Sequence, residues 1–159
     1  MKRLLYLVPA LLVIFSCDNA SLLSGIDQED LFHSVKHTDS LRIELDFQNR
    51  EISEPEDIEA EFVLENITDD TLRYRFSSGC QVGYFISTRG QRVFDSTERV
   101  MCTAALTKLV IEPGKSARYT ISLEHFDTDD IQLEKGLYRL TAFLLGDYGV
   151  KITAPFVTR

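Results

Sequence analysis

Residues 58–76 read IEAEFVLENITDDTLRYRF, and the spacing of their apolar residues decides the fold class. In residues 58–64 and again in residues 72–76, apolar side chains recur at every second position between charged ones. A period of two is typical of a β-strand that buries one face. Between the two runs, the Asn and Asp side chains of residues 66–70 favour a tight turn, because they hydrogen-bond to their own backbone. The stretch therefore predicts two β-strands joined by a turn.

Similar alternation recurs along most of the chain after residue 40. Turn signals separate the runs: Arg89-Gly90 predicts a hairpin, because glycine accepts a positive φ, and Pro113-Gly114-Lys115 predicts another turn. Residues 137–145 are apolar on both faces, which fits a central strand. The pattern predicts an all-β fold, an antiparallel immunoglobulin-like β-sandwich. The further predicted strands are residues 41–47, 84–88, 91–94, 106–111, 119–123, 138–144 and 152–156.

The first seventeen residues are typical of a bacterial export signal. Lys2 and Arg3 precede an apolar run of about 12 residues, which suits a signal peptide and is too short to span a membrane. The run ends at Ser16-Cys17, which resembles a bacterial lipobox, so we expect a signal peptide in residues 1–16 and lipidation of Cys17. An ordinary secretory signal with an incidental cysteine is the alternative. Lipidation would anchor the protein to a membrane of the bacterial cell envelope, on its periplasmic or surface face.

The remaining chain divides into a tether and one domain. Residues 17–39 are polar and serine-rich, so we expect a lipidated N-terminus and flexible tether, with one weak helical patch at residues 28–35 that Asp27 could cap. Residues 40–159 are enough for one globular β-sandwich domain with its own core.

The two cysteines that follow Cys17 are Cys80 and Cys102. An even pair in an oxidising compartment most simply forms a disulfide, which would close a loop of about 23 residues and stabilise the fold by about 3–4 kcal/mol. A catalytic thiol at Cys80 would instead need a basic partner that lowers its pKa. The chain offers only three histidines, none near Cys80 in sequence. We therefore assign no catalytic residue and expect no enzyme activity.

Two clusters suggest metal sites at first sight. His33 and His37 have the i, i+4 spacing that would place both imidazoles on one face of a helix, but no third ligand is evident. The acidic residues 127–130 lack the glycine and the distal glutamate of a calcium loop, so an acidic surface turn is the simpler interpretation. We expect no metal and no cofactor.

The charge balance excludes one class of partner. The chain has 25 Asp and Glu against 17 Lys and Arg, a net charge of −8. Loss of Lys2 and Arg3 with the signal peptide would bring the net charge to about −10, a surface that nucleic acid and anionic headgroups repel. We expect no nucleic-acid partner, and we assign membrane contact to the lipid anchor alone.

Four blocks of sequence carry a family resemblance. They are FVLENITDD and LRYRFSSG within residues 62–79, the hairpin of residues 84–96, the P-G turn of residues 109–115, and the G-x-Y strand of residues 136–142. Their order and spacing resemble the BsuPI family, the intracellular proteinase inhibitor domain, over residues 40–146. Cys80 departs from the family pattern, where glutamine often follows Ser-Ser-Gly. The resemblance implies an immunoglobulin-like β-sandwich that inhibits a proteinase.

An inhibitor of this kind would have a protein partner, such as a serine protease. It would bind through an extended loop that the scaffold holds rigid, because such a loop loses little entropy on binding. Residues 96–103, STERVMCT, are the candidate, since the loop is tied at Cys102 and Arg99, Val100 and Met101 could occupy specificity pockets. The competing hypothesis is a non-enzymatic interaction or structural module of the envelope, without inhibitory activity.

Overall fold

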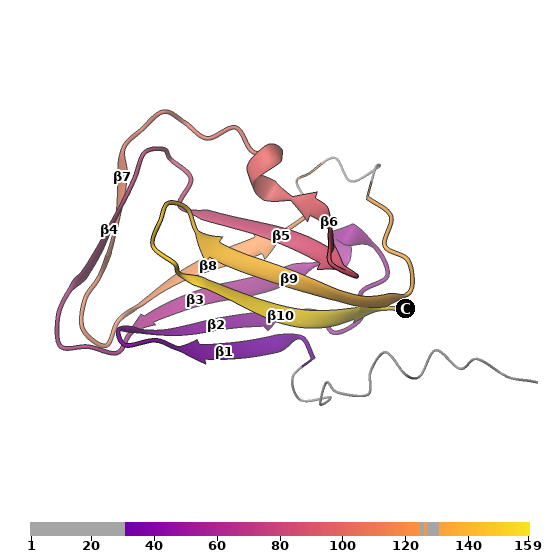
Figure 1. Ribbon diagram of the computed structural model, residues 1–159, viewed down its shortest axis with the longest axis horizontal. Helices are drawn as coiled ribbons and strands as arrows, with labels where there is room; N and C mark the ends of the chain where they lie inside the picture. The colour runs from indigo at the N-terminus through magenta and orange to yellow at the C-terminus, as the bar shows by residue number, and fades with distance from the viewer. Residues whose placement is uncertain (1–30, 125, 127–130) are drawn as a thin grey trace, which may run out of the picture.

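The computed structural model describes residues 31–124, 126 and 131–159, which form ten β-strands (Figure 1). Two short 3-10 helices, η3 (Pro55–Asp57) and η4 (Ser96–Glu98), lie in the connections. In the described residues, no helix is long and apolar enough to cross a membrane. The predicted signal peptide, Cys17 and the acidic residues 127–130 lie outside the described residues. The strands are β1 (His33–His37), β2 (Leu41–Phe47), β3 (Glu59–Asn66), β4 (Leu72–Phe76), β5 (Val82–Thr88), β6 (Gln91–Asp95), β7 (Thr107–Ile111), β8 (Ser116–Ser122), β9 (Gly136–Leu144) and β10 (Lys151–Thr158).

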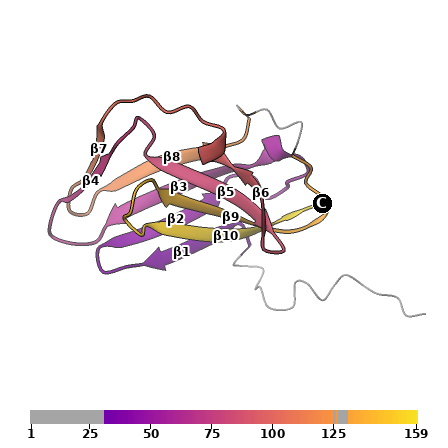
Figure 2. The same ribbon diagram turned by 45° about the horizontal axis from the view of Figure 1, so that its top comes forward.

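Eight of the strands form two four-stranded sheets that face each other (Figure 1, Figure 2). One sheet has the order β1-β2-β3-β8 and the other β10-β9-β5-β6, and every paired strand is antiparallel to its neighbour. With β2, β3 and β8 as strands A, B and E, and β5, β9 and β10 as strands C, F and G, this is the strand order of an immunoglobulin-like sandwich. The predicted fold class is confirmed.

The core lies between the two sheets and consists of the alternating apolar side chains. In β2, Leu41, Ile43, Leu45 and Phe47 are buried, while the residues between them are only partly covered. The ring of Phe47 lies 5.2 Å from that of Phe156 on β10, across the sandwich. Burial of a side chain of this size contributes about 1.5–3 kcal/mol, so these facing rows are the main source of stability.

Strand β9 occupies the centre of its sheet, as its apolar pattern predicts. It lies between β10 and β5 and pairs with both along most of its length. Leu140 and Ala142 are fully buried on the core side, and Thr141 on the opposite face is also buried, where its hydroxyl is hydrogen-bonded to that of Thr153 at 2.8 Å. A strand covered on both faces shows weak alternation, which explains its sequence.

The turn after β3 is organised by Asn66, which is fully buried. Its side-chain nitrogen donates hydrogen bonds to the carbonyl oxygens of Asp70 at 2.7 Å and Ile111 at 2.9 Å. Its side-chain oxygen accepts from the backbone N–H two residues further on, at 3.0 Å. The predicted Pro113-Gly114-Lys115 turn packs against it, because the backbone of Asn66 bonds to that turn in both directions. Both predicted turns are therefore present and are joined to each other.

Strands β4 and β7 form a two-stranded ribbon outside both sheets, at one end of the sandwich (Figure 1). Their register runs from Leu72 opposite Ile111 to Phe76 opposite Thr107. Alternation places Phe76 and Ile111 against the core, and the residues of the other parity on the exposed face. The ribbon carries the chain from β3 to β5 and again from β6 to β8, which are two of its three passages between the sheets.

The predicted domain boundary at residue 40 is wrong, because the fold includes residues before it; residues 17–30 of the predicted tether lie outside the described residues. Residues 33–37, which include part of the predicted helical patch, form strand β1, paired antiparallel with β2 from His33 opposite Asp46 to His37 opposite Arg42. Phe32 is buried against Phe47, with ring centroids 5.7 Å apart. The strand was hidden in the sequence because it lies at a sheet edge and carries mostly polar side chains.

Candidate functional site

The candidate site is the connection between β6 and β7, residues 96–106, which we call the binding loop. It begins in η4 beside β5, runs along the top of the molecule and ends where β7 enters the ribbon (Figure 1). It includes the predicted segment of residues 96–103. Its geometry follows from three attachments to the scaffold, at its start, near its middle and at its end.

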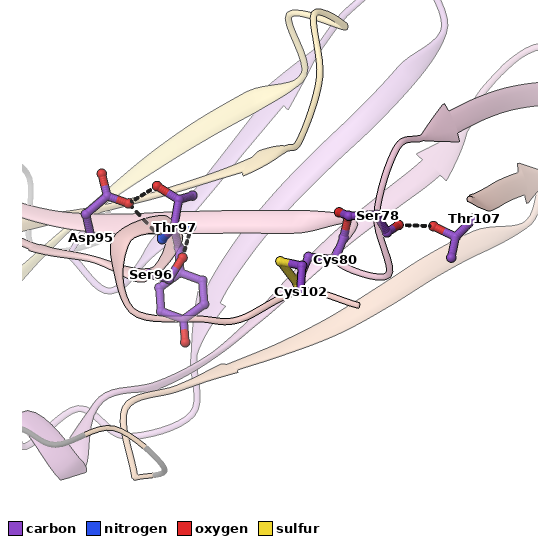
Figure 3. Close-up of a disulfide and its surroundings, with 8 residues drawn as sticks. Ser78, Cys80, Asp95, Ser96, Thr97, Cys102 and Thr107 are labelled. Atoms are coloured by element: carbon purple, nitrogen blue, oxygen red, sulfur yellow. Dashed lines mark hydrogen bonds between the residues drawn. A yellow bond between two sulfur atoms is a disulfide. The ribbon is translucent and has the colours of Figure 1, made fainter. Parts of the chain in front are cut away.

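The first attachment is a cap at Asp95, whose side chain is buried. Its carboxylate accepts hydrogen bonds from the backbone N–H of Thr97 at 2.9 Å and the hydroxyl of Thr97 at 2.7 Å (Figure 3). It also forms an ion pair with Arg92. Burial raises the pKa of Asp95, but the hydrogen bonds from Thr97 and the charge of Arg92 outweigh it, so the pKa lies below its ordinary value. A charged Asp95 thus holds the first turn of the loop.

The same end of the loop is bonded to strand β5. The backbone N–H of Tyr84 donates to the hydroxyl of the buried Ser96 at 2.9 Å. The phenol of Tyr84 donates to the carbonyl of Ser122 at 2.9 Å, and burial raises the pKa of Tyr84 to about 12. Gly83 allows the close approach: a Cβ there would lie 2.9 Å from Cγ2 of Thr97 and closer still to the ring of Phe143.

The second attachment is the disulfide between Cys80 and Cys102, which the sequence predicts and the structure contains (Figure 3). It joins the middle of the binding loop to the turn between β4 and β5, with Cα atoms 5.4 Å apart. Immediately beside it, the backbone N–H of Gly79 donates to the carbonyl of Thr103 at 2.9 Å. A disulfide sulfur carries no thiolate, so Cys80 is not a nucleophile in this state.

The third attachment is at the end of the loop, where the hydroxyl of Thr107 donates to the carbonyl of Ser78 at 2.8 Å (Figure 3). Between the attachments the loop is exposed. Met101 is 98% exposed, Leu106 is 87% exposed and Val100 is 41% exposed. The loop therefore presents large apolar side chains to solvent from a backbone that is fixed on both sides.

The structure changes the expected conformation of this loop. Its first residues turn through η4, and Arg99 has helical φ and ψ values, so the substrate-like extended form expected for residues 96–103 does not apply to this part. The guanidinium of Arg99 lies 5.5 Å from the ring centroid of Phe94, a cation–π contact. Val100 and Met101 are exposed, and Arg99 lies over the ring of Phe94; their assignment to specificity pockets stays a prediction.

Leu106 is the residue that sequence reasoning missed. The run of residues 106–111 was assigned entirely to a strand, but β7 begins at Thr107. The alternation of the strand could have revealed it. Leu109 and Ile111 face inward, so the even-numbered positions, including 106, face outward. With 87% exposure, Leu106 is a third large apolar side chain that the loop presents to solvent, and it lies on the other side of Cys102 from Val100 and Met101.

A depression of about 380 Å³ adjoins the disulfide, lined by residues 75–78, Cys80 and residues 145–148. Tyr148 fixes its wall, since its hydroxyl accepts from the backbone N–H of Arg75 at 2.8 Å and donates to the carbonyl of the same residue. Its ring packs edge-on against Tyr74, with centroids 5.0 Å apart. The β9–β10 turn is thereby attached to the outer edge of the ribbon.

The metal hypotheses gain no support from the described part of the chain, where no group of three or more His, Cys, Asp or Glu side chains could hold a metal ion. His33 and His37 lie on a strand, where four residues span about 13 Å, and not on a helix. His33 is hydrogen-bonded to Glu44 at 3.0 Å instead. That bond, with help from Arg42 and against the effect of burial, lowers the pKa of Glu44.

Fold and site together define a class of protein, an immunoglobulin-like scaffold with a disulfide-anchored, exposed loop. Residues 45–148 match the BsuPI family, described as intracellular proteinase inhibitor, and the chain belongs to this family. The family is one of inhibitors rather than enzymes. No curated protein sequence matches the chain.

Solved structures with a similar region include two β-glucosidases. The enzyme from Listeria innocua in complex with glucose is 15% identical, with a TM-score of 0.40 over 74% of this chain and 16% of the enzyme. The enzyme from Erythrobacter marinus is 14% identical, with a TM-score of 0.39 over 80% of this chain and 15% of the enzyme. The chain thus spans about a sixth of these proteins, and nothing about function is drawn from likeness at this level.

Proposed function

We propose that this protein inhibits a proteinase by reversible, non-covalent binding of its binding loop to the enzyme. The observation that carries the proposal is the 98% exposure of Met101 directly beside the disulfide at Cys102. A large apolar side chain costs little to bury in a partner's pocket when its backbone is already fixed, because the ordering entropy is not lost on binding. Membership of the inhibitor family supports this use of the loop.

The residues of the loop have different roles in this proposal. Val100 and Met101 enter the proteinase, and Leu106 extends the apolar contact toward the ribbon. Arg99 supports the loop through its contact with Phe94. No covalent step is required of the inhibitor, and a serine protease is the partner first to be tested.

The protein acts, in the same proposal, at the bacterial cell envelope, anchored through lipidated Cys17 after removal of residues 1–16. This part rests on the sequence alone. Fractionation of cells that express the full chain tests it: membrane association should be lost in Cys17→Ser. Equal membrane association of the two proteins would contradict the lipid anchor.

Inhibition assays on the chain without its signal peptide test the central part. We expect inhibition of at least one member of a panel of serine, cysteine and metallo-proteinases, and Met101→Asp should weaken it at least tenfold, because a charge would be buried in an apolar pocket. Ile67→Asp is the matched control, since Ile67 is 46% exposed on the turn after β3. Absence of inhibition across the panel, or full inhibition by Met101→Asp, would overturn the proposal.

The second candidate function is an envelope interaction module without inhibitory activity. The depression beside the exposed face of the ribbon favours it, since a protein partner could bind there without occupying the loop. Capture of partners from solubilised envelope with the mature chain separates the two functions. A proteinase supports inhibition, and a structural assembly supports the module.

A further inference from the structure

We propose that the exposed face of the β4–β7 ribbon docks an acidic segment of a partner protein. The face carries Arg73, Arg75 and Lys108, which we call the basic face. This docking site is separate from the tip of the binding loop and does not rest on proteinase inhibition. The partner is recognised by its chemistry, an extended segment that alternates carboxylates with apolar side chains.

The basic face places like charges side by side. In the register of the ribbon, Arg75 lies directly opposite Lys108, and Arg73 lies two residues away on the same face. Cross-strand neighbours have Cβ atoms about 4.5–5.5 Å apart, and like charges placed there destabilise a strand pair. The arrangement is unfavourable for the isolated protein, and a bound carboxylate would relieve it.

No carboxylate of the described residues neutralises the charges of the basic face. Some strand cations elsewhere find carboxylates, since Arg42 bonds to Glu44 and Arg118 to Glu61, both at 2.7 Å. Within the described residues, Lys36, Arg139 and Lys151 have no ion pair either, but they lie on three different strands and do not form one cluster. Within the part of the chain that the structure describes, none of the three basic-face side chains has an ion pair. A protein with a net charge of −8 thus keeps three adjacent cations available to a partner.

The three cations lie between exposed apolar side chains and the depression beside the disulfide. Val110 lies opposite Arg73 and is 47% exposed, and Leu106, the loop residue immediately before the same strand, is 87% exposed. On the other side, Arg75 lines the depression of about 380 Å³ together with Ser77 and Tyr148. The cations would pair with the acidic side chains of such a segment. Val110, Leu106 and the depression would contact its apolar side chains.

An acidic protein segment fits this surface better than an anionic membrane does. At physiological salt the Debye length is about 8 Å, so a narrow segment would sense mainly the three local cations. A membrane surface would face the whole protein, whose net charge of −8 opposes its approach. Asp147 also lines the depression, and its carboxylate would repel an acidic segment. Its replacement by a neutral residue should therefore raise the affinity for the segment.

A fluorescein-labelled peptide of alternating glutamate and valine tests the proposal by fluorescence anisotropy. We expect it to bind the chain that lacks its signal peptide at about 0.02 M salt, and to bind more weakly at about 0.3 M, where charges are screened. Reversal of the basic face in Arg73→Glu/Arg75→Glu/Lys108→Glu should weaken binding at least tenfold. Asp147→Asn should tighten it.

The matched control is Lys36→Glu/Arg139→Glu/Lys151→Glu, which makes the same change in net charge at exposed cations of β1, β9 and β10. It should retain most of the binding, and circular dichroism should show both triple variants folded. Absence of binding to the unaltered protein, or equal losses in both triple variants, would overturn the proposal. Binding to vesicles of anionic lipid that needs the basic face, with none to the peptide, would also overturn it.

Discussion

Two connections lead into the strands of the ribbon: the β3–β4 turn leads into β4, and the binding loop leads into β7. They are fixed to the scaffold in different ways. The turn between β3 and β4 is short and is organised by one buried side chain, Asn66. The binding loop between β6 and β7 is longer and is attached at Asp95, at the Cys80–Cys102 disulfide and at Thr107, with exposed residues between. The first connection is used to hold the fold. The second also holds the fold, and it leaves large apolar side chains exposed to solvent.

The largest expected effect is on the loop side, where the disulfide is a covalent attachment. Cys80→Ser/Cys102→Ser should lower the free energy of unfolding by about 3–4 kcal/mol, because the unfolded chain regains the entropy of a loop of about 23 residues. Urea unfolding monitored by circular dichroism measures it. Cys17→Ser, outside this pair, is the control and should change little. A loss below about 1 kcal/mol would mean that the loop is held by its other contacts.

The next largest effect is on the turn side. Asn66→Ala should cost about 2–3 kcal/mol, since the buried carbonyl oxygen of Ile111, the carbonyl oxygen of Asp70 and a backbone N–H lose their partner. Asn49→Ala is the matched control: its side chain accepts from the backbone N–H of Glu51 in an exposed turn, and its loss should cost under about 1 kcal/mol. Equal costs for the two variants would remove the distinction between the connections.

A smaller effect is expected at the start of the binding loop. Asp95→Ala should cost about 1–2 kcal/mol at neutral pH, the usual worth of an N-cap, while Thr97→Ser keeps the hydroxyl bond and should be close to neutral. Because the folded pKa of Asp95 is lowered, its contribution is present above the unfolded pKa of about 3.9 and is lost as the pH falls. Urea unfolding at neutral and acidic pH should show the two proteins converging in acid. A constant difference would contradict the role of the charge.

The smallest effect lies away from both connections, at Glu44 on β2. Its folded pKa is lowered by His33 and Arg42, so its stabilisation is present above the unfolded pKa of about 4.3 and is lost as the pH falls. Glu44→Gln should flatten the acid limb of the stability curve slightly. Glu59→Gln, which removes one carboxylate at an exposed end of β3, is the matched control for the change in charge. An unaltered acid limb in Glu44→Gln would show that this ion pair does not stabilise the fold.

The sequence predicts the features that depend on contacts between neighbouring residues better than those that depend on contacts between distant residues. The Asn66 turn and the Arg89-Gly90 hairpin depend on neighbours in the chain, and the structure has both. The alternation located every strand except β1, whose polar side chains lie at an edge. The disulfide could be predicted from the sequence because Cys80 and Cys102 are the two cysteines left once Cys17 is assigned to lipidation.

The rest of the site depends on contacts between residues far apart in the sequence. The pairing of Arg75 with Lys108 could not be inferred, so a local basic face was hidden in an acidic chain. The wall of the depression requires Tyr148 to meet the backbone of Arg75, which no local pattern encodes. The first residues of the loop form η4 instead of the expected extended segment, and Arg99 there contacts Phe94.

The most direct test of the central claim is photo-crosslinking in the intact cell envelope. A photoreactive amino acid is placed at position 101 of the full chain and, in a separate protein, at position 67, which is exposed on the other connection. We expect a proteinase to be crosslinked from position 101 and not from position 67. Crosslinking from position 67 with none from position 101 would show that the binding loop is not the surface this protein uses.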